Sequence, residues 1–201
     1  MPELILPDVS EFQPNVQWPE VKAANGGAAI MRAMYGSGHV DKAWYGGARR
    51  HAAHEAGIHA LGLYQYLVAA EPVEPQAQAF ISLVGQLKPG EFAILDLEEG
   101  TGDQSARANA WLHAVDAHLT YPGYRGAWLY SGAAFFEEHG LMPIANSSRH
   151  TWVADYATTP PAVPHTLWQY SDAVAWKGIG TCDSSKFNGS LQDFEKAIGQ
   201  A

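Results

Sequence analysis

Two carboxylic acids stand two residues apart in the segment Ile94-Leu95-Asp96-Leu97-Glu98-Glu99-Gly100, at the end of an apolar run. Side chains alternate along a strand, so Asp96 and Glu98 project from one face while Leu95 and Leu97 face the other way. Buried carboxylates are unfavourable unless they are paired, hydrogen-bonded or used in chemistry. A helix cap or a salt-bridged loop is the structural alternative. The chemical alternative is a protonated acid beside an ionised partner, as glycoside cleavage requires.

Two more acids fall near the expected ends of other strands. Asp8 closes a first apolar run, and Asp183 follows Gly178-Ile179-Gly180, where an eighth strand is expected to end. Each one alone is typical of a turn or cap residue. In a parallel barrel, however, the carboxyl ends of the strands form one rim that builds the active site. We therefore expect Asp8, Asp96, Glu98 and Asp183 to form a catalytic group there, with their pKa values perturbed by one another.

Aromatic residues follow the same strand ends. Aromatic faces with polar tips suit the C–H faces and hydroxyls of sugars. About half of these residues are assigned to the core, and Tyr64, Tyr130, Trp152 and Trp168 are the expected substrate contacts. The full set is Tyr64, Tyr66, Trp128, Tyr130, Trp152, Tyr156, Trp168 and Tyr170.

Other chemistry has less support. His51 and His54 have helical spacing for a metal, but beside Arg49, Arg50 and Glu55 they are interpreted as a solvated face, and no metal or cofactor is expected. Glycine-rich nucleotide loops, the Gly-x-Ser-x-Gly elbow and His-Glu-x-x-His are missing from the sequence, and the single Cys182 has no triad context.

The elements that must position the acids are short apolar or alternating runs separated by helical patterns. Helices are predicted after Pro72 and Pro75, and after a cap at Asp103. Alternating strands and helices indicate an α/β fold with a parallel sheet. The eight predicted strands are 4–9, 28–33, 59–67, 91–97, 126–131, 151–154, 166–170 and 179–183.

The last third breaks this alternation. Residues 154–166 hold three prolines, and residues 170–179 are too few for a parallel crossover, so these strands are expected to join by hairpins or loops. We expect an irregular TIM-like barrel with eight strands whose helices are missing in the last third, and a doubly wound open sheet is the alternative. No linker or repeat divides residues 1–201, so a single catalytic domain is predicted.

Composition excludes some classes of partner. The chain has 12 Lys and Arg against 21 Asp and Glu, a formal charge of −9, and no basic run. This balance argues against binding to nucleic acid or to an anionic membrane, which need clustered cations. The start shows neither a signal peptide nor a spanning segment, so the chain is expected to carry no export signal.

Taken in order, the motifs resemble those of the family 25 glycoside hydrolases, the Chalaropsis-type lysozymes or N-acetylmuramidases. The resemblance runs nearly end to end and is carried by Asp8-Val9-Ser10 with Gln13, Ala56-Gly57-Ile58, Gly62-Leu63-Tyr64, Leu95-Asp96-Leu97-Glu98, Leu129-Tyr130-Ser131-Gly132, Trp152-Val153-Ala154-Asp155-Tyr156, Leu167-Trp168-Gln169-Tyr170, and Asp183 with Phe187-Asn188-Gly189.

The resemblance implies a barrel with eight strands and about five helices that cleaves the β-1,4 bond from N-acetylmuramic acid to N-acetylglucosamine in peptidoglycan glycan strands. It makes Glu98 the general acid, Asp96 its partner at the anomeric side, Asp8 and Asp183 supporting acids, and Tyr64 a sugar contact. The sequence departs from the family at Gln65-Tyr66, where His-Phe is usual, and at Arg32-Ala33, where Lys-Ala or a similar pair is common. These departures affect substrate detail.

Mechanism and biological setting stay open at this point. The substrate's 2-acetamido group can attack the anomeric carbon with Asp96 assisting, which we favour over a covalent intermediate on Asp96.

The alternative functions are an inactive barrel that binds cell walls, and a barrel glycosidase acting on another N-acetylated polymer such as chitin. Localisation is unknown. A phage endolysin or a catalytic domain from a longer lysin is expected.

Overall fold

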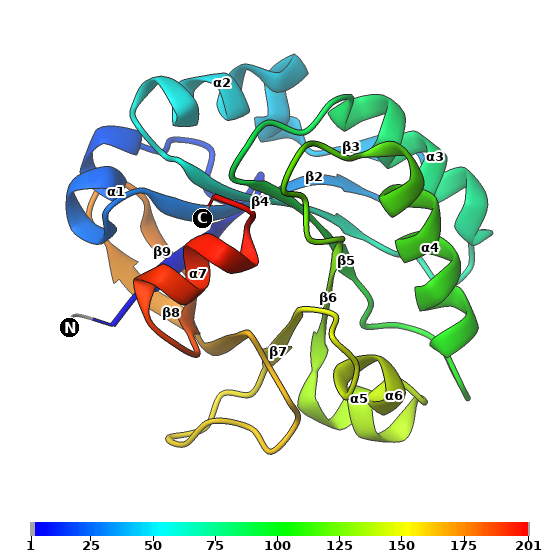
Figure 1. Ribbon diagram of the computed structural model, residues 1–201. Coiled ribbons are helices and arrows are strands. Elements are labelled where there is room, and N and C mark those ends of the chain that lie inside the picture. The colour runs from blue at the N-terminus through cyan, green and yellow to red at the C-terminus, as the bar shows by residue number, and fades with distance from the viewer. Residues whose placement is uncertain (1–2, 201) are drawn as a thin grey trace.

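The computed structural model describes residues 3–200 as one closed barrel. Its strands follow the order β1-β9-β8-β7-β6-β5-β4-β2-β3, and a further β1–β2 pairing joins the two sides, so eight strands close while β3 is a hairpin on the edge of β2. The barrel prediction is confirmed and the open sheet was wrong (Figure 1). The strands are β1 (Ile5–Val9), β2 (Ala28–Tyr35), β3 (His39–Val40), β4 (Ala60–Tyr66), β5 (Glu91–Asp96), β6 (Trp128–Gly132), β7 (Thr151–Ala154), β8 (Leu167–Trp176) and β9 (Gly180–Phe187).

Seven α-helices occur in residues 3–200, more than the five that the resemblance implied. The proline-rich segment between β7 and β8 and the β8–β9 turn contain no helix, as predicted, but a helix closes the chain after β9. The helices are α1 (Trp18–Asn25), α2 (Ala48–Glu55), α3 (Val73–Val84), α4 (Ser105–His118), α5 (Ala133–Glu138), α6 (Met142–Ala145) and α7 (Leu191–Ala197), with a 3₁₀ helix η1 (Lys42–Gly47) before α2.

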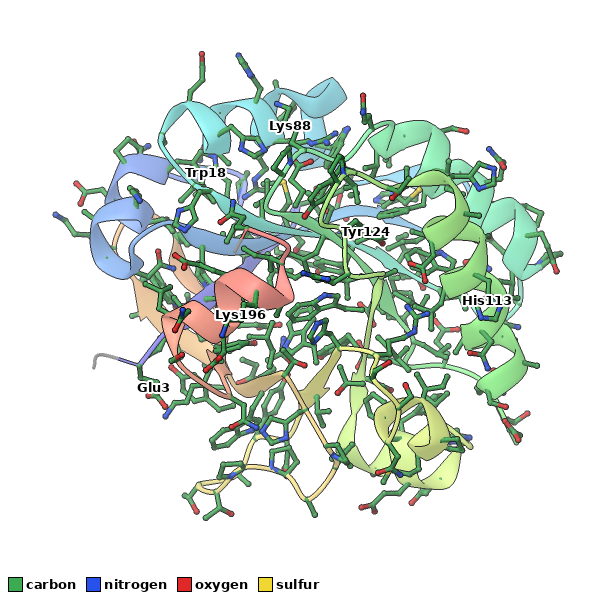
Figure 2. All side chains as sticks on the ribbon, in the orientation of Figure 1. Glu3, Trp18, Lys88, His113, Tyr124 and Lys196 are labelled. Carbon is green, nitrogen blue, oxygen red and sulfur yellow. The ribbon has the colours of Figure 1, made fainter. Side chains whose placement is uncertain are left out.

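Apolar side chains form two clusters separated by the strands. On β5, Ala93 and Leu95 face the helices, whereas Phe92 and Ile94 join the cluster inside the barrel. This strand is buried on both faces, which explains why its sequence is apolar at both parities. Phe194 of α7 belongs to the inner cluster, so α7 covers the barrel end at which the parallel strands begin, and it lies in front of the strands in Figure 1. Side chains fill the enclosed space in Figure 2, with the labelled Lys196 marking α7.

Strand β9 differs from the sequence prediction in length, because it covers Gly180–Phe187 instead of residues 179–183. It runs antiparallel to both β1 and β8, and Asp183 lies in its first half, paired in register with Asp8. The expectation that a strand ends at Asp183 was wrong, because the strand stays paired with β1 and β8 as far as Lys186 and Phe187. The β8–β9 connection is a hairpin that reverses the chain, as expected from a segment too short for a parallel crossover. The reversal still brings Asp183 to the rim where the parallel strands end.

Helix α2 was interpreted as a solvated face, which holds only for His51 and Glu55. Arg49 is buried, and Arg50 and His54 contact the fully buried carboxylate of Glu91 at the start of β5, with Arg50 Nε 2.6 Å and His54 Nε2 2.7 Å from Oε1. Burial raises the pKa of Glu91, but hydrogen bonds from Arg50, His54 and the Lys88 N–H outweigh it and lower that pKa to about 2. This ionic cluster therefore anchors α2 to the barrel.

Residues 3–200 contain no helix long and apolar enough to cross a membrane. Nor does this part of the chain bring three or more His, Cys, Asp or Glu residues together as a metal site.

We predict that Glu91→Gln destabilises the barrel, because it leaves the buried Arg50 guanidinium without its counter-ion. Loss of one partner of a buried pair costs about 3–5 kcal/mol, which for a chain of this size lowers Tm by roughly 10 °C. The pKa of Glu91 is lowered from 4.5, so its ionisation stabilises the fold above about pH 4.5 and this stabilisation is lost as the pH falls toward 2. Thermal melting should show that the Tm of Glu91→Gln lies far below that of the wild type at pH 7 and only slightly below it at pH 2.5.

Glu55→Gln is the matched control, because Glu55 pairs only with His51 and both side chains are about two-thirds exposed. Exposed ion pairs contribute little, so its Tm should stay near that of the wild type. Equal Tm values for the two variants at pH 7 would contradict the role given to the Glu91 cluster.

Candidate active site

Asp96 and Glu98 lie on one face of β5, as the strand alternation predicts. Asp96 is the last residue of β5 and pairs with Tyr66 and Tyr130 on the flanking strands. The chain stays extended beyond it, since the Leu97 N–H donates to the Tyr130 carbonyl at 3.1 Å. Asp96 is 5% exposed and Glu98 is exposed, and the two side chains approach closely enough to share a hydrogen bond. One carboxyl is therefore buried and its neighbour faces solvent.

Asp8 and Asp183 meet on the other side of the barrel, where β1 pairs with β9. Asp8 is 8% exposed, and its Oδ1 has no hydrogen-bond partner among residues 3–200. Asp183 accepts a long hydrogen bond of 3.4 Å from Gln169 Nε2. Both aspartates line a small cavity of about 80 Å³ together with Tyr64. The four predicted acids thus share one end of the barrel interior.

Burial is the main cause of the electrostatic character of this group. It raises the pKa of Asp8 and Asp96 well above the ordinary value, and the neighbouring carboxylates raise these pKa values further. Burial raises the pKa of Asp183 to about 6, with Asp172 and Glu98 adding to the shift. The pKa of Glu98 is also raised by the protein atoms packed around it. The site therefore retains protons at pH values where free carboxyls have lost them.

Arg32 is a cation of the site that the sequence interpretation treated only as a family departure. Its Nε donates to Asp41 at 2.8 Å and its Nη2 lies 3.1 Å from Glu11, so its position is fixed. Its charge lowers the pKa values of Asp8 and Asp96, in opposition to burial. A charged residue two positions after Ile30, which lies in the inner cluster, is the pattern that could have revealed it.

Three of the four predicted aromatic contacts line the barrel interior near the acids. Tyr64 packs edge to face with Trp152 at 6.4 Å between ring centroids, and Tyr130 lies 4.2 Å from Trp152. Trp152 is only 1% exposed and donates to Ser185 Oγ at 2.8 Å, so it supports the other two rings from below. Burial raises the pKa of Tyr64 well above 10, so its hydroxyl stays protonated.

Trp168 is not brought to this group. It lies on the face of β8 opposite to Gln169, under Lys186 Nζ at 5.7 Å from its ring centroid, and donates to the Asp155 carbonyl. Strand alternation is the physical reason, because Leu167 and Gln169 take the inward positions. The tryptophan positions the loop after β7.

Gln169 is a site residue that the sequence interpretation missed as such. Its Oε1 accepts hydrogen bonds from Tyr130 at 2.8 Å and from Tyr156 at 3.0 Å, while its Nε2 faces Asp183. Tyr156 is 57% exposed, so its ring stands free above the acids. The inward parity of Gln169 beside the apolar Leu167 is the pattern that could have identified it.

Comparison with known proteins decides the family. The model of glycosyl hydrolases family 25 matches residues 7–179, most of the chain. The chain belongs to this family. It is a glycoside hydrolase, and the matched range includes Asp8, Asp96 and Glu98 and ends four residues before Asp183.

Relatives of this family 25 hydrolase are named as lysozymes and muramidases. Lysozyme M1 of Streptomyces globisporus is 28% identical over 203 residues, covering 91% of this chain and 67% of that protein. The crystal structure of a bacterial lysozyme from Streptomyces coelicolor superposes with a TM-score of 0.83 at 25% identity, with 100% of both chains covered. A muramidase from Trichobolus zukalii shares the fold, with a TM-score of 0.81 at 22% identity and coverage of 98% and 99%.

We predict that Asp96→Asn stabilises the family 25 hydrolase at pH 8 and not at pH 3. The folded-state pKa of Asp96 is raised above the ordinary 3.8, so the folded protein binds this proton more tightly than the unfolded chain, and its free energy of unfolding falls as the pH rises above about 4. The amide of Asp96→Asn carries no charge, so the variant does not lose stability in this way. Its free energy of unfolding at pH 8 should exceed that of the wild type by about 1–2 kcal/mol.

Denaturant unfolding at the two pH values measures the effect. Glu138→Gln, at an exposed position on α5, is the control and should leave stability unchanged at both. A destabilised Asp96→Asn at pH 8 would show that the ionised carboxylate is well accommodated.

Proposed function

We propose that this family 25 hydrolase cleaves the β-1,4 bond between N-acetylmuramic acid and N-acetylglucosamine in peptidoglycan. The names of its relatives, lysozyme and muramidase, support this substrate. The observation that carries the proposal is the pair of unlike carboxyls on one strand end, with Asp96 buried and Glu98 facing the open rim. Glycoside cleavage requires two carboxyls in different environments.

Glu98 is the general acid in this proposal. Its side chain reaches solvent, where a leaving oxygen can approach, and burial raises its pKa, which favours the protonated form that the reaction needs. Donation of this proton to the glycosidic oxygen breaks the bond to the anomeric carbon, and the sugar gains positive character. The same carboxylate then takes a proton from the incoming water.

Asp96 acts on the anomeric side. Deep burial beside Glu98 suits a carboxylate that orients the 2-acetamido N–H of the substrate and stabilises the positive charge of an oxazolinium intermediate. The rival is a covalent bond from Asp96 to the anomeric carbon, for which the carboxyls should lie about 5–5.5 Å apart. We favour assistance by the substrate, since the 2-acetamido group supplies the nucleophile itself.

The remaining site residues have supporting roles in the proposal. Asp8 and Asp183 supply further carboxyl oxygens beside the sugar carrying the developing charge, and Tyr64 and Tyr130 contact that sugar next to Trp152. Tyr156 is added to this group as an exposed aromatic face for a neighbouring sugar. Trp168 donates to the Asp155 carbonyl, and its role in the proposal is to support the loop after β7 instead of contacting the glycan.

We predict that Glu98→Gln lowers kcat by 10²–10⁴-fold, because an amide cannot donate the proton that general acid catalysis needs. Asp96→Asn should be severely impaired as well. Glu99→Gln is the matched control. Its carboxylate accepts from the Ala69 N–H at 3.1 Å and the Tyr35 hydroxyl at 3.4 Å, away from the acid pair, so most activity should remain. Equal damage from Glu98→Gln and Glu99→Gln would contradict the assignment of the acid.

Mass spectrometry of fragments released from purified peptidoglycan tests the proposed reaction. New reducing-end muramic acid is expected, and chitin treated in parallel should stay intact. Reducing-end glucosamine would overturn the bond assignment, and release of soluble chitin fragments would overturn the substrate.

A further inference from the structure

A second hollow opens beside the acid pair, on the flank formed by the loops that follow β4 and β5. It is a cavity of about 520 Å³ bordered by Ala69, Gly100, Gln104 and Arg107. Both loops leave the carboxyl ends of parallel strands, so this hollow lies on the active face. Glu99, the residue after the proposed general acid, marks the boundary between the two sites.

Gln104 presents a buried acceptor to this hollow. Its side chain is only 5% exposed, and its Nε2 donates to the Thr101 carbonyl at 2.6 Å, which fixes the orientation of the amide. Its Oε1 has no partner among residues 3–200. Gly100 leaves room beside this atom, since a Cβ at Gly100 would lie 2.5 Å from Gln104 Oε1. A buried acceptor without a partner is unfavourable, so it indicates a group that arrives from outside.

Arg107, one helical turn further along α4, presents a buried donor. Its Nη1 donates to the Ala69 carbonyl at 2.8 Å and its Nη2 to the Val68 carbonyl at 3.1 Å. The Nε–H is buried and has no partner within residues 3–200. Because the backbone occupies the outer nitrogens, the guanidinium cannot grip an anion through two hydrogen bonds, and it offers one N–H to one oxygen.

One free acceptor, on Gln104 at the N-cap of α4, and one free donor, on Arg107 in its first turn, match the N–H and the C=O of one residue in an extended peptide, because these two groups point to the same side of the chain. Glu99 does not take part, because its oxygens already accept from Ala69 and Tyr35. The proposed substrate carries amides at this location, because the lactyl group of muramic acid bears a peptide next to the cleaved bond. We propose that the hollow at Gln104 and Arg107 binds the backbone N–H and C=O of one residue of this peptide and so favours peptide-bearing glycan.

This inference rests on the proposed function, and its test separates the two. One glycan is intact peptidoglycan, and the other is the same material stripped of its peptides by an amidase, with the lactyl carboxyls then capped as methyl esters, which carry no N–H and no charge. The wild-type enzyme should show a kcat/KM at least tenfold higher on the peptide-bearing glycan, mostly through KM. Gln104→Met keeps the shape and removes the acceptor, and it should reduce this ratio by about tenfold, the effect of one lost hydrogen bond to a buried group.

Activity of Gln104→Met on the capped glycan should equal that of the wild type, which shows that the variant is folded and that its acid pair is intact. Gln78→Met, at an exposed position on α3, should leave both rates unchanged. If Gln104→Met fails to fold, Arg107→Lys removes Nε and should give the same loss of ratio. A ratio that stays at the wild-type value in the folded variant means that the hollow holds only water, and it overturns the inference. Absence of muramic reducing ends from both glycans with the wild-type enzyme overturns the proposed function.

Discussion

Four carboxyl groups share one end of a largely apolar barrel interior, and much of the surrounding structure holds them in place. Asp8 and Asp96 are nearly buried, and Arg32, which lowers their pKa values, is already bound to Asp41 and Glu11. Ionising all four carboxyl groups at once is therefore unfavourable, and the group retains protons at pH values where free carboxyls have lost them. The crowding of buried carboxyl groups destabilises the fold locally, and it keeps one of them protonated as the acid that the proposed reaction needs.

Stability is provided elsewhere. The helices pack their apolar faces on the outside of the barrel, and Phe194 of α7 covers the end at which the parallel strands begin. The Glu91 cluster links α2 to the start of β5. These features lie at the opposite end of the strands or on the outer surface, so the rim is free to carry unfavourable charge. A larger cavity of about 780 Å³ beside α7 holds none of the four acids. The candidate active site is therefore identified by its cluster of carboxyl groups and not by the size of its cavity.

The sequence predicts the fold and the acid pair because both depend on local alternation. Asp96 and Glu98 share a face through the same periodicity that buries Phe92 and Ile94. The full length of β9 was not accessible, because Ser184, Ser185 and Lys186 interrupt its apolar pattern although they lie within the strand. The contact of His54 with Glu91 joins residues 37 positions apart, and no local pattern encodes it. Trp168 was selected by residue type, although its parity opposite to Gln169 already placed it outside the barrel.

The central claim is that Asp96 and Glu98 titrate as one coupled pair with a raised pKa. Carbon-13 NMR of the enzyme labelled at the Asp and Glu carboxyls, followed from pH 3 to pH 9, measures this directly, with Glu98→Gln used to assign the signals. The account predicts that both carboxyls respond to the same two titration steps, and that one step lies well above the ordinary values of 3.8 and 4.5. Two independent titrations at those ordinary values would contradict it.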